Sequence, residues 1–541
     1  MRPVQEFTVG QVHEAIADTR PDQECLVFRD RRYTWREVTE RTRRLAAFLN
    51  EAGLGCHTER ASLSPSESGQ DHLAIYLHNG NEYLERMLGA FKARVAPFNV
   101  NYRYVAEELT YLLQDSAATA IVYHSTFAPT LETVRPALPR LRVLLQVPDE
   151  SGHPLLPGAV WYEDALAASD ENSTHATATP DDLYILYTGG TTGMPKGVMW
   201  RQGDALVECF GASKTATNLD EFLAAAVGRR ALIAPPFMHG AGHWVSLGTW
   251  NIGGTVFVPS VPERLDPVDI WTLVERERID FMLIVGDAFA RPLIDELKKN
   301  RYDLSSLNVL LSGGAALSSH LKEELLQIAP HLIVIDGLGS SEAGGQLTHV
   351  SAAGGASTGT FPLAPNNHVL SDAMDRVLEP GDPEVGWLAK SGRLALGYLG
   401  DPAKTDRTYP VVNGVRYVVP GDRAVLREGN IVELRGRDSV TINSGGEKIF
   451  AEEVEMAVKP HPAVFDCVVT GRPSERWGNE VVAVVQIRPG FDPTDQDLLD
   501  EAARHIARYK LPKAFVRVES IVRSPSGKAD YRWAKEIAAK A

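Results

Sequence analysis

The chain has 541 residues, of which 44% are hydrophobic and 23% are charged. A chain of this length is too long for one ordinary hydrophobic core, so we expect several subdomains in a globular protein. The formal net charge of −15 argues against nucleic acid as a partner, because non-specific binding to nucleic acid needs a basic surface.

Neither a membrane span nor a secretion signal is expected. No stretch approaches eighteen uncharged apolar residues, and the first ten residues contain no apolar core of a signal peptide. The four cysteines lie far apart, with no CxxC pair, which argues against a disulfide framework and fits a reducing compartment. The sequence therefore predicts a cytoplasmic protein without a transmembrane segment.

The first predicted elements are two short strands at 25–28 and 33–35 and the helix that follows them. Thr34 is a residue type that caps helices, and Glu37 stands three residues later, where it completes a capping box. Further along the chain, residues 72–77 predict a strand and residues 81–94 a helix. Apolar segments then alternate with helical ones, and strands are expected at 119–123, 141–146, 231–234, 255–258, 281–285, 309–311 and 332–335. Such repeated βα units predict an α/β fold with parallel sheets covered by helices.

Two other regions differ in composition from these units. Residues 62–71 are rich in Ser, Pro and Gly and predict an exposed, mobile loop, most simply a tolerated surface insertion. From about residue 434 a compact pattern begins, with a helix at 452–459 and strands at 464–470 and 480–488. We therefore predict an N-terminal domain over 1–434, a hinge over 435–440 and a small, mobile α+β domain over 441–541.

The most informative stretch is 187–198, which reads Tyr-Thr-Gly-Gly-Thr-Thr-Gly-Met-Pro-Lys-Gly-Val. Glycines let the backbone approach a ligand closely, and successive N–H groups, hydroxyls and a lysine can form a concave nest for phosphate. A Walker loop is excluded by the spacing, since it requires Gly before the lysine and Ser or Thr after it. Here Pro195 and Gly197 flank Lys196.

This stretch resembles the phosphate loop of the adenylate-forming superfamily, which comprises acyl-CoA synthetases, firefly luciferases and nonribosomal-peptide adenylation domains. Six later stretches resemble further motifs of that superfamily in the same order: 234–240, 312–317, 336–342, 417–422, 436–455 and 524–528. The ordered set covers nearly the whole chain. The resemblance implies a large α/β domain and a small mobile C-terminal domain.

The resemblance also implies which residues bind ATP. The phosphate loop, the adenine loop and the fifth motif supply Thr188, Gly189, Gly190, Thr191, Thr192, Gly193, Lys196, Gly313, Gly314, Ala315, Asp336, Gly337, Leu338, Gly339 and Ser341. Asp422 is expected to accept from the ribose hydroxyls, and Arg437 to hold ribose or phosphate. Gly446 and Lys448 belong to the face that is presented for the second half-reaction.

Three residues are expected to carry the chemistry. By resemblance, Lys528 contacts both the substrate carboxylate and the α-phosphate of ATP. Glu342 is the expected Mg²⁺ ligand, with the Thr188 hydroxyl as the second protein contact, since Mg²⁺ prefers one or two carboxylates plus phosphate oxygens and water. His239 is the expected gate between the acyl pocket and the thiol channel, although a histidine in this context is equally a satisfied core residue.

Small residues in these motifs predict a roomy acyl tunnel, unless they serve only backbone turns. They are Gly240, Ala241, Gly242, Gly313, Gly314, Gly344 and Gly345. Three positions depart from the superfamily pattern: Leu338 replaces an aromatic residue, Pro420 a threonine, and Ser439 the charged hinge residue. A hinge need not be charged. Together with strings such as 442–448 and 527–535, these departures resemble actinobacterial CoA ligases that activate steroid side-chain acids and related fatty acids.

The predicted activity is an acyl-CoA synthetase that uses ATP, Mg²⁺ and coenzyme A and activates a small-molecule carboxylic acid through acyl-AMP. A homodimer is expected from base rates. Two alternatives stay open: an acyl-AMP ligase that delivers to a carrier protein, and a non-catalytic nucleotide sensor, for which only Leu338, Pro420 and Ser439 speak. A luciferase-like oxygenase would need a special substrate.

Overall fold

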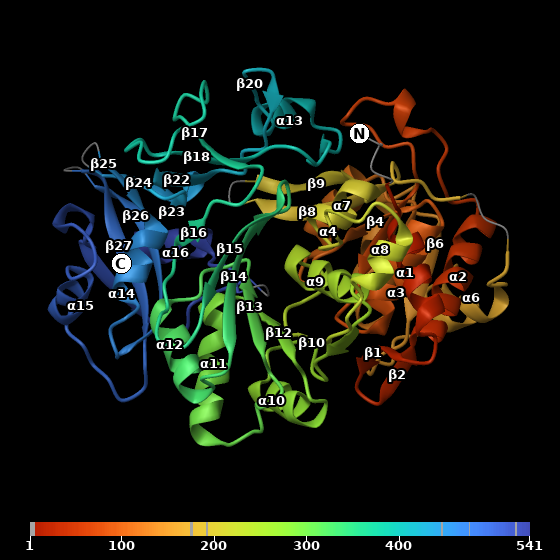
Figure 1. Cartoon of the computed structure of the whole chain (residues 1–541), viewed down its shortest axis with the longest axis horizontal. Helices are drawn as coiled ribbons and strands as arrows, with labels where there is room; N and C mark the ends of the chain where they lie inside the picture. The colour runs from red at the N-terminus through yellow and green to blue at the C-terminus, as the bar shows by residue number, and fades with distance from the viewer. Residues whose placement is uncertain (1–5, 174–176, 191–192, 445–446, 475–476, 525–526) are drawn as a thin grey trace.

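The computed structural model of the chain describes residues 6–173, 177–190, 193–444, 447–474, 477–524 and 527–541. Two eight-stranded sheets, one five-stranded sheet and three small sheets are built from these residues. Figure 1 shows the larger part of the chain with the C-terminal segment, residues 441–541, in blue on one side beside α11 (Gly286–Lys299) and α12 (Ser319–Ile328).

The first large sheet has the strand order β15-β14-β13-β12-β10-β11-β1-β2. Its six central strands run parallel, and the two edge strands β15 and β2 pair antiparallel. The strands are β1 (Glu24–Phe28), β2 (Arg31–Thr34), β10 (Arg230–Ile233), β11 (Thr255–Val258), β12 (Phe281–Ile284), β13 (Val309–Gly313), β14 (Ile333–Ser340) and β15 (Gly344–Ser351). The parallel centre confirms the predicted sheet type.

The second large sheet has the order β19-β9-β8-β4-β3-β5-β6-β7. Strands β8 to β7 in this order are parallel, whereas β9 pairs antiparallel with both β8 and β19. The strands are β3 (His72–Tyr76), β4 (Ala96–Asn99), β5 (Ala120–His124), β6 (Val143–Val147), β7 (Val160–Trp161), β8 (Leu183–Gly190), β9 (Gly193–Arg201) and β19 (Gly397–Tyr398).

Helices fill the space between these sheets and cover both outer faces. Alternate side chains of one strand enter different cores: Leu26 joins the core between the sheets, while Val27 joins the core under the outer helices. The central helices are α1 (Val9–Thr19), α2 (Trp35–Glu51), α3 (Asn81–Lys92), α6 (Tyr162–Ala168), α7 (Gln202–Glu208), α8 (Leu219–Ala224) and α9 (Gly240–Asn251). The outer helices are α10 (Pro267–Arg276), α11 and α12 on the first sheet, and α4 (Ala106–Asp115) and α5 (Ala128–Val134) on the second. Among the described helices, none has the length and apolar character to cross a bilayer.

The third sheet is antiparallel throughout and was not predicted from the sequence. Its order is β16-β23-β22-β18-β17, from β16 (Thr360–Pro362), β17 (Asn367–Leu370), β18 (Gly386–Lys390), β22 (Asp422–Arg427) and β23 (Ile431–Arg437). Next to it lie α13 (Pro402–Thr408) and the hairpin of β20 (Val411–Val412) and β21 (Val415–Arg416). The predicted hinge therefore begins inside β23, and a 3₁₀ turn, Asp438–Val440, follows.

The C-terminal segment has its own α+β core. A hairpin of β24 (Thr441–Ser444) and β25 (Glu447–Phe450) precedes a three-stranded sheet of β26 (Val464–Ser474), β27 (Gly478–Ile487) and β28 (Ala514–Val518). Helices α14 (Ala451–Val458) and α15 (Asp495–Ala502) share one core with Cys467 and Val469, while α16 (Tyr531–Lys540) covers the face that carries Val468 and Val484.

The loop at 62–71 is less exposed than predicted, because half of its residues are partly buried and Asp71 is buried, and the loop is tied to its neighbours. The backbone N–H of Gly400 donates to the carbonyl of Ser66 at 2.9 Å, and Ser68 Oγ lies 2.7 Å from His72 Nε2. The loop thus packs on the turn that follows β19.

The capping box at the start of α2 is present as predicted. The Thr34 hydroxyl accepts from the Glu37 backbone N–H at 3.2 Å, and the Glu37 carboxylate accepts from the Thr34 N–H at 2.7 Å. We expect Thr34→Ala to lower the free energy of unfolding by about 1 kcal/mol, because a helix-terminal N–H loses its partner. Urea unfolding monitored by fluorescence would measure the change. Thr34→Ser, which keeps the hydroxyl, is the matched control, and equal midpoints for Thr34→Ala and the wild type would contradict the prediction.

Candidate active site

Lys528 lies on a tight loop of the C-terminal segment and faces the first large sheet. Its backbone is fixed by Ser524, whose N–H donates to the Lys528 carbonyl at 2.9 Å and whose Oγ accepts from the Lys528 N–H at 3.2 Å. A Cβ placed on Gly314, just beyond β13, would lie 4.0 Å from Lys528 Cε. The loop therefore brings the lysine to the carboxyl ends of the parallel strands.

Four other predicted residues lie around Lys528. Burial, and then the charge of Arg437, lower the pKa of Lys528, while Glu342 and Asp422 act in the opposite direction. Burial, and then Lys528, lower the pKa of His239 to about 3. Lys528 is nevertheless exposed to solvent, so a ligand can reach it. The group thus joins residues that are 289 positions apart in sequence, from His239 to Lys528.

Asp422 and Arg437 face each other on neighbouring strands β22 and β23. Arg437 Nε donates to Asp422 Oδ1 at 3.3 Å, and Asp422 is the first-ranked cause of the raised pKa of Arg437. The other carboxylate oxygen, Asp422 Oδ2, is buried and has no hydrogen-bond partner. Leaving such an oxygen unpaired is costly, so the site fits a ligand that supplies hydroxyl donors.

Glu342 follows β14 and is oriented by an aromatic neighbour. The Tyr398 hydroxyl donates to Glu342 Oε1 at 2.8 Å, and Trp200 Nε1 donates to the carbonyl of Ser341 at 2.8 Å. No group of three or more His, Cys, Asp or Glu side chains within the described residues is arranged to hold a metal ion. A single oriented carboxylate fits a Mg²⁺ ion that takes its remaining ligands from phosphate and water.

The predicted phosphate loop is a β-hairpin in the part that the structure describes. Thr188 pairs with Lys196 and Gly190 with Gly193 across β8 and β9, while Thr191 and Thr192 lie outside the described residues. The backbone groups of the two strands therefore pair with each other, whereas the sequence predicted a nest of free N–H groups. The glycines allow the close pairing: a Cβ on Gly197 would lie 2.8 Å from the Tyr187 ring.

Lys196 is paired with a carboxylate of α4, which the sequence did not predict. Its Nζ donates to Asp115 Oδ1 at 3.0 Å, and the Tyr187 hydroxyl donates to Asp115 Oδ2 at 2.9 Å. Tyr111, one turn earlier on α4, donates to the Pro195 carbonyl at 3.2 Å. The one signal for this anchor in the sequence is the spacing of Tyr111 and Asp115 on one helix face.

The predicted adenine site lies at the ends of β13 and β14. Register pairs Ser312 with Asp336 and Gly313 with Gly337, so the two motifs are neighbours. Asp336 Oδ2 accepts from the fully buried Lys322 at 2.5 Å, and Lys322 also donates to Thr358 Oγ1 at 3.0 Å. Lys322 was not predicted, although it lies on the face of α12 that carries Leu321, Leu325 and Leu326, which is a signal for a buried cation.

The other predicted residues of the adenine loop and the fifth motif serve packing and backbone geometry. Leu338 packs against the core of the third sheet, and Ala315 packs against the core beneath α11 and α12. Gly314 has a φ of +88°, which a side chain would strain. Gly339 lies in β14 opposite Gly345.

The two histidines near α9 differ in how well their nitrogens are paired. His243 Nδ1 lies 2.6 Å from the Phe237 carbonyl and its Nε2 lies 2.5 Å from the Tyr184 hydroxyl, which accepts from Trp244 Nε1 at 2.8 Å. His239, the residue before α9, has a buried Nε2 without a partner. Of the pair, His239 is the one with a nitrogen left for a ligand.

The small residues predicted to line an acyl tunnel include two that serve close backbone approach instead. A Cβ on Gly242 would lie 2.5 Å from the Pro236 carbonyl oxygen, and one on Gly344 would lie 2.6 Å from that of Glu208. Gly240 faces the side chains of Leu186 and Trp244, each about 3.2 Å from a Cβ at that position. Gly242 and Gly344 are therefore explained by backbone packing, and fewer small residues than predicted remain to line an acyl tunnel.

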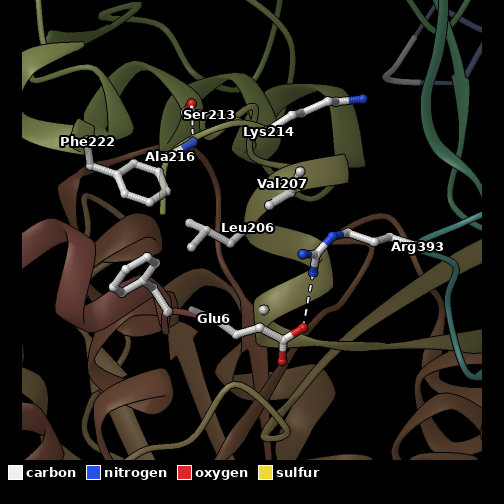
Figure 2. A pocket seen from close by; sticks show the side chains of 10 residues that line it. Glu6, Leu206, Val207, Ser213, Lys214, Ala216, Phe222 and Arg393 are labelled. Atoms are coloured by element: carbon white, nitrogen blue, oxygen red, sulfur yellow. Dashed lines mark hydrogen bonds and ion pairs between the residues drawn. The ribbon is translucent and has the colours of Figure 1, made fainter. Parts of the chain in front are cut away.

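A small cavity lies elsewhere, between the N-terminus, α7 and α8 (Figure 2). It measures about 20 Å³, enough for a single water molecule, and the Glu6–Arg393 ion pair of 3.2 Å lies at its edge. None of the residues around Lys528 lines it.

The face predicted to serve the second half-reaction lies on the β24–β25 hairpin. Lys448 is exposed there, and its charge acts on Asp372 in the loop after β17. Gly446 lies outside the described residues. Lys448 thus does not belong to the group around Lys528.

Comparison with known proteins identifies close relatives. Residues 13–399 match the family described as AMP-binding enzyme, and residues 453–528 match the AMP-binding enzyme C-terminal domain. The chain is 52% identical over 540 residues to the medium-chain acyl-CoA ligase Mig of Mycobacterium avium, with 98% of each chain covered. It is 37% identical to a 3-oxocholest-4-en-26-oate–CoA ligase of Rhodococcus rhodochrous, covering 98% of this chain and 96% of the relative. The structure of ATP-bound MatB from Rhodopseudomonas palustris has the same fold, with a TM-score of 0.82 at 21% identity and 98% and 99% coverage.

The depressed pKa of His239 makes a direct prediction. Because burial and Lys528 hold this pKa at about 3, the imidazole stays neutral from pH 5 to pH 8. Lys528→Ala removes the repelling charge and should raise the pKa of His239, which burial still keeps below 6.5. Nitrogen chemical shifts of ¹⁵N-histidine-labelled protein would measure it, with His239→Gln assigning the signal and the urea-unfolded chain as the reference. A His239 signal that titrates near pH 6.5 in the folded protein would refute the prediction.

Proposed function

Since this chain belongs to the family of AMP-binding enzymes, we propose that it is an ATP-dependent acyl-CoA synthetase that activates a carboxylic acid through acyl-AMP. The observation that carries the proposal is the 52% identity to a medium-chain acyl-CoA ligase over 98% of both chains. The grouping of Arg437, Asp422 and Glu342 near Lys528 supports it.

The first half-reaction joins two anions, a carboxylate and the α-phosphate of ATP, and releases pyrophosphate. Their repulsion is the main barrier that the protein has to lower, so positioning and charge stabilisation supply most of the rate. We assign the contact to both anions to Lys528. Its ammonium then stabilises the charge that builds up on the phosphoryl oxygens as the new bond forms.

The nucleotide is expected to occupy the ends of β13, β14 and β22. Asp422 would accept from the ribose hydroxyls through the unpaired Oδ2, while Arg437 holds its Oδ1. Glu342 and Thr188 would hold Mg²⁺. When bound, this ion neutralises phosphate charge and orients the leaving pyrophosphate.

The second half-reaction requires a different face of the C-terminal segment, residues 441–541, which we now call the lid. We propose that the lid rotates about Ser439, withdraws Lys528 and presents the hairpin that carries Lys448. The thiol of coenzyme A then attacks the acyl carbon, and AMP leaves. The exposure of Lys448 is compatible with this alternation.

The relatives narrow the acid. Their names specify medium-chain fatty acids and 3-oxocholest-4-en-26-oate, and both are apolar acids that need a long, hydrophobic pocket. We propose a medium-chain fatty acid as the substrate, with the side-chain acid of a steroid as the second choice, because the identity to the medium-chain enzyme is higher. A panel of octanoate, palmitate, a steroid side-chain acid and a phenylalkanoate, scored by coenzyme A consumption, ranks these options.

The central test is the split between half-reactions. Lys528→Ala should reduce exchange of radiolabelled pyrophosphate into ATP by on the order of 10²- to 10³-fold, because the preorganised charge at the reacting phosphate is lost. Conversion of supplied acyl-AMP into the thioester should stay near the wild-type rate, because Lys528 is withdrawn in that step.

Three further outcomes complete this test. Wild-type protein that never exchanges pyrophosphate with any acid of the panel would leave the nucleotide-sensor alternative. Exchange without thioester formation from free coenzyme A would indicate delivery to a carrier protein. Equal loss of both half-reactions in Lys528→Ala would contradict the alternating lid.

A further inference from the structure

One ion pair connects the lid to the large N-terminal part of the chain close to the Lys528 loop. Lys459, at the end of α14, places its Nζ 3.3 Å from Asp287 Oδ2 in the first turn of α11. Only 10% of the Lys459 side chain and 9% of the Asp287 side chain are exposed. Figure 1 shows α11 and α12 beside the lid at this place. The pair is thus a buried contact between two parts of the chain, unlike an exposed surface ion pair, which contributes little.

The contact continues inside the lid as a chain of alternating charges. Lys459 Nζ lies 3.7 Å from Asp466 Oδ1, and Asp466 binds Arg523 through two bonds of 2.6 and 2.7 Å. Arg523 then donates to the carbonyl of Gly527 at 3.0 Å. Gly527 is the residue immediately before Lys528. A continuous series of contacts therefore runs from α11 to the backbone of the catalytic loop.

All four charges are retained at neutral pH. Burial acts to lower the pKa of Lys459, but Asp287 and Asp466 raise it above its ordinary value. Burial acts to raise the pKa of Asp466 and of Asp287, but Lys459 and further hydrogen bonds hold both below their ordinary values. The pKa of Arg523 is raised, since Asp466 outweighs its burial.

Asp287, at the α11 end of this series of charges, is held in place by hydrogen bonds. Asp287 accepts from both the backbone N–H and the hydroxyl of Ser318, each at 2.7 Å, at the start of α12. Beside it, Gly527 lies so close to α11 that a Cβ would stand 3.3 Å from Ala288 Cβ. The lid therefore meets α11 here at two neighbouring points, one ionic and one steric, and Arg488 of the lid approaches Asp295 of the same helix at 3.8 Å.

We propose that Asp287, Lys459, Asp466 and Arg523 form a positioning device that holds Lys528 over the nucleotide for acyl-AMP formation and is opened at Asp287–Lys459 when the lid rotates. This inference rests on the proposed function, since it assigns the device to one of the two half-reactions. Asp287, Lys459, Asp466 and Arg523 are positioning residues, because their charges act on the substrate only through the placement of Lys528.

Geometry explains why the device favours one half-reaction. Asp466 and Arg523 both belong to the lid and travel with it, whereas Asp287 belongs to α11 and stays behind. Breaking Asp287–Lys459 exposes both charges to water, which restores their hydration and limits the cost of rotation. An interface of apolar side chains would offer no comparable compensation, so an ion pair suits a contact that has to open in every cycle.

The test compares Lys459→Met with the wild type in both half-reactions. We expect pyrophosphate exchange to fall by about ten- to a hundredfold, since small displacements of a catalytic group have effects of that size. Thioester formation from supplied acyl-AMP should stay unchanged. Lys459→Arg, which keeps the charge, should restore most of the exchange activity, and Asp287→Asn should reproduce the defect from the other side of the contact.

Lys298→Met is the matched control. Lys298 lies on the same helix, α11, as Asp287. The variant removes an exposed ion pair of 2.5 Å between Lys298 and Glu324 of α12. We expect both half-reactions of this variant to match the wild type.

The outcomes separate the two proposals. Wild-type protein without any pyrophosphate exchange would reject the proposed function itself. An active wild type, together with unchanged exchange in Lys459→Met and Asp287→Asn, would overturn the positioning device alone. Equal losses of both half-reactions in these variants, with a lowered unfolding midpoint, would also overturn it, because the pair would then serve only stability.

Discussion

The balance of charges around the Lys528 ammonium determines what the candidate active site can bind. A chain with a net charge of −15 has to meet a polyanionic nucleotide with local cations, and Lys528 and Arg437 are two cations that the fold brings together. Burial, and then the charge of Arg437, lower the pKa of Lys528, while Glu342 and Asp422 oppose both effects. Positive and negative charges therefore partly offset each other around Lys528. A carboxylate oxygen of Asp422 and an imidazole nitrogen of His239 have no hydrogen-bond partner and remain as contacts for a ligand.

The scaffold behind this balance is the carboxyl edge of a parallel sheet. Gly314 follows β13, Asp336 lies in β14 and Glu342 follows it, and in open α/β sheets ligands bind at this edge because the strand ends there leave room for loops. The lid adds Lys528 from the other side. Neither part alone contains the site, so the geometry between the two parts is itself a catalytic variable.

Local rules predicted the parts of this molecule that depend on local sequence. Apolar runs indicated the parallel strands, and Thr34 with Glu37 indicated a helix start. The antiparallel third sheet was not predicted, because charged residues interrupt the apolar runs of its longest strands, β22 (Asp-Arg-Ala-Val-Leu-Arg) and β23 (Ile-Val-Glu-Leu-Arg-Gly-Arg). Site residues that carry motifs were found, whereas Asp115 and Lys322 were missed, since their partners, Lys196 and Asp336, are distant in sequence and only the fold brings them together.

Buried lysines that pair with carboxylates recur around the cleft. Lys322 binds Asp336, and Lys390 binds Glu208 at 2.7 Å while it donates to the carbonyls of Ala343 and Gly345. Such pairs lose hydration and add little net stability compared with apolar packing. Each one, however, fixes a backbone segment beside a residue of the site: Lys390 holds the carbonyls of Ala343 and Gly345, which follow Glu342 in the chain. The same chemistry at Lys459 differs in one respect, because its carboxylate partner lies across a movable boundary. Inside the large N-terminal part, such a pair only fixes a loop. Between Lys459 of the lid and Asp287 of α11, the same kind of pair favours one of two orientations of the lid.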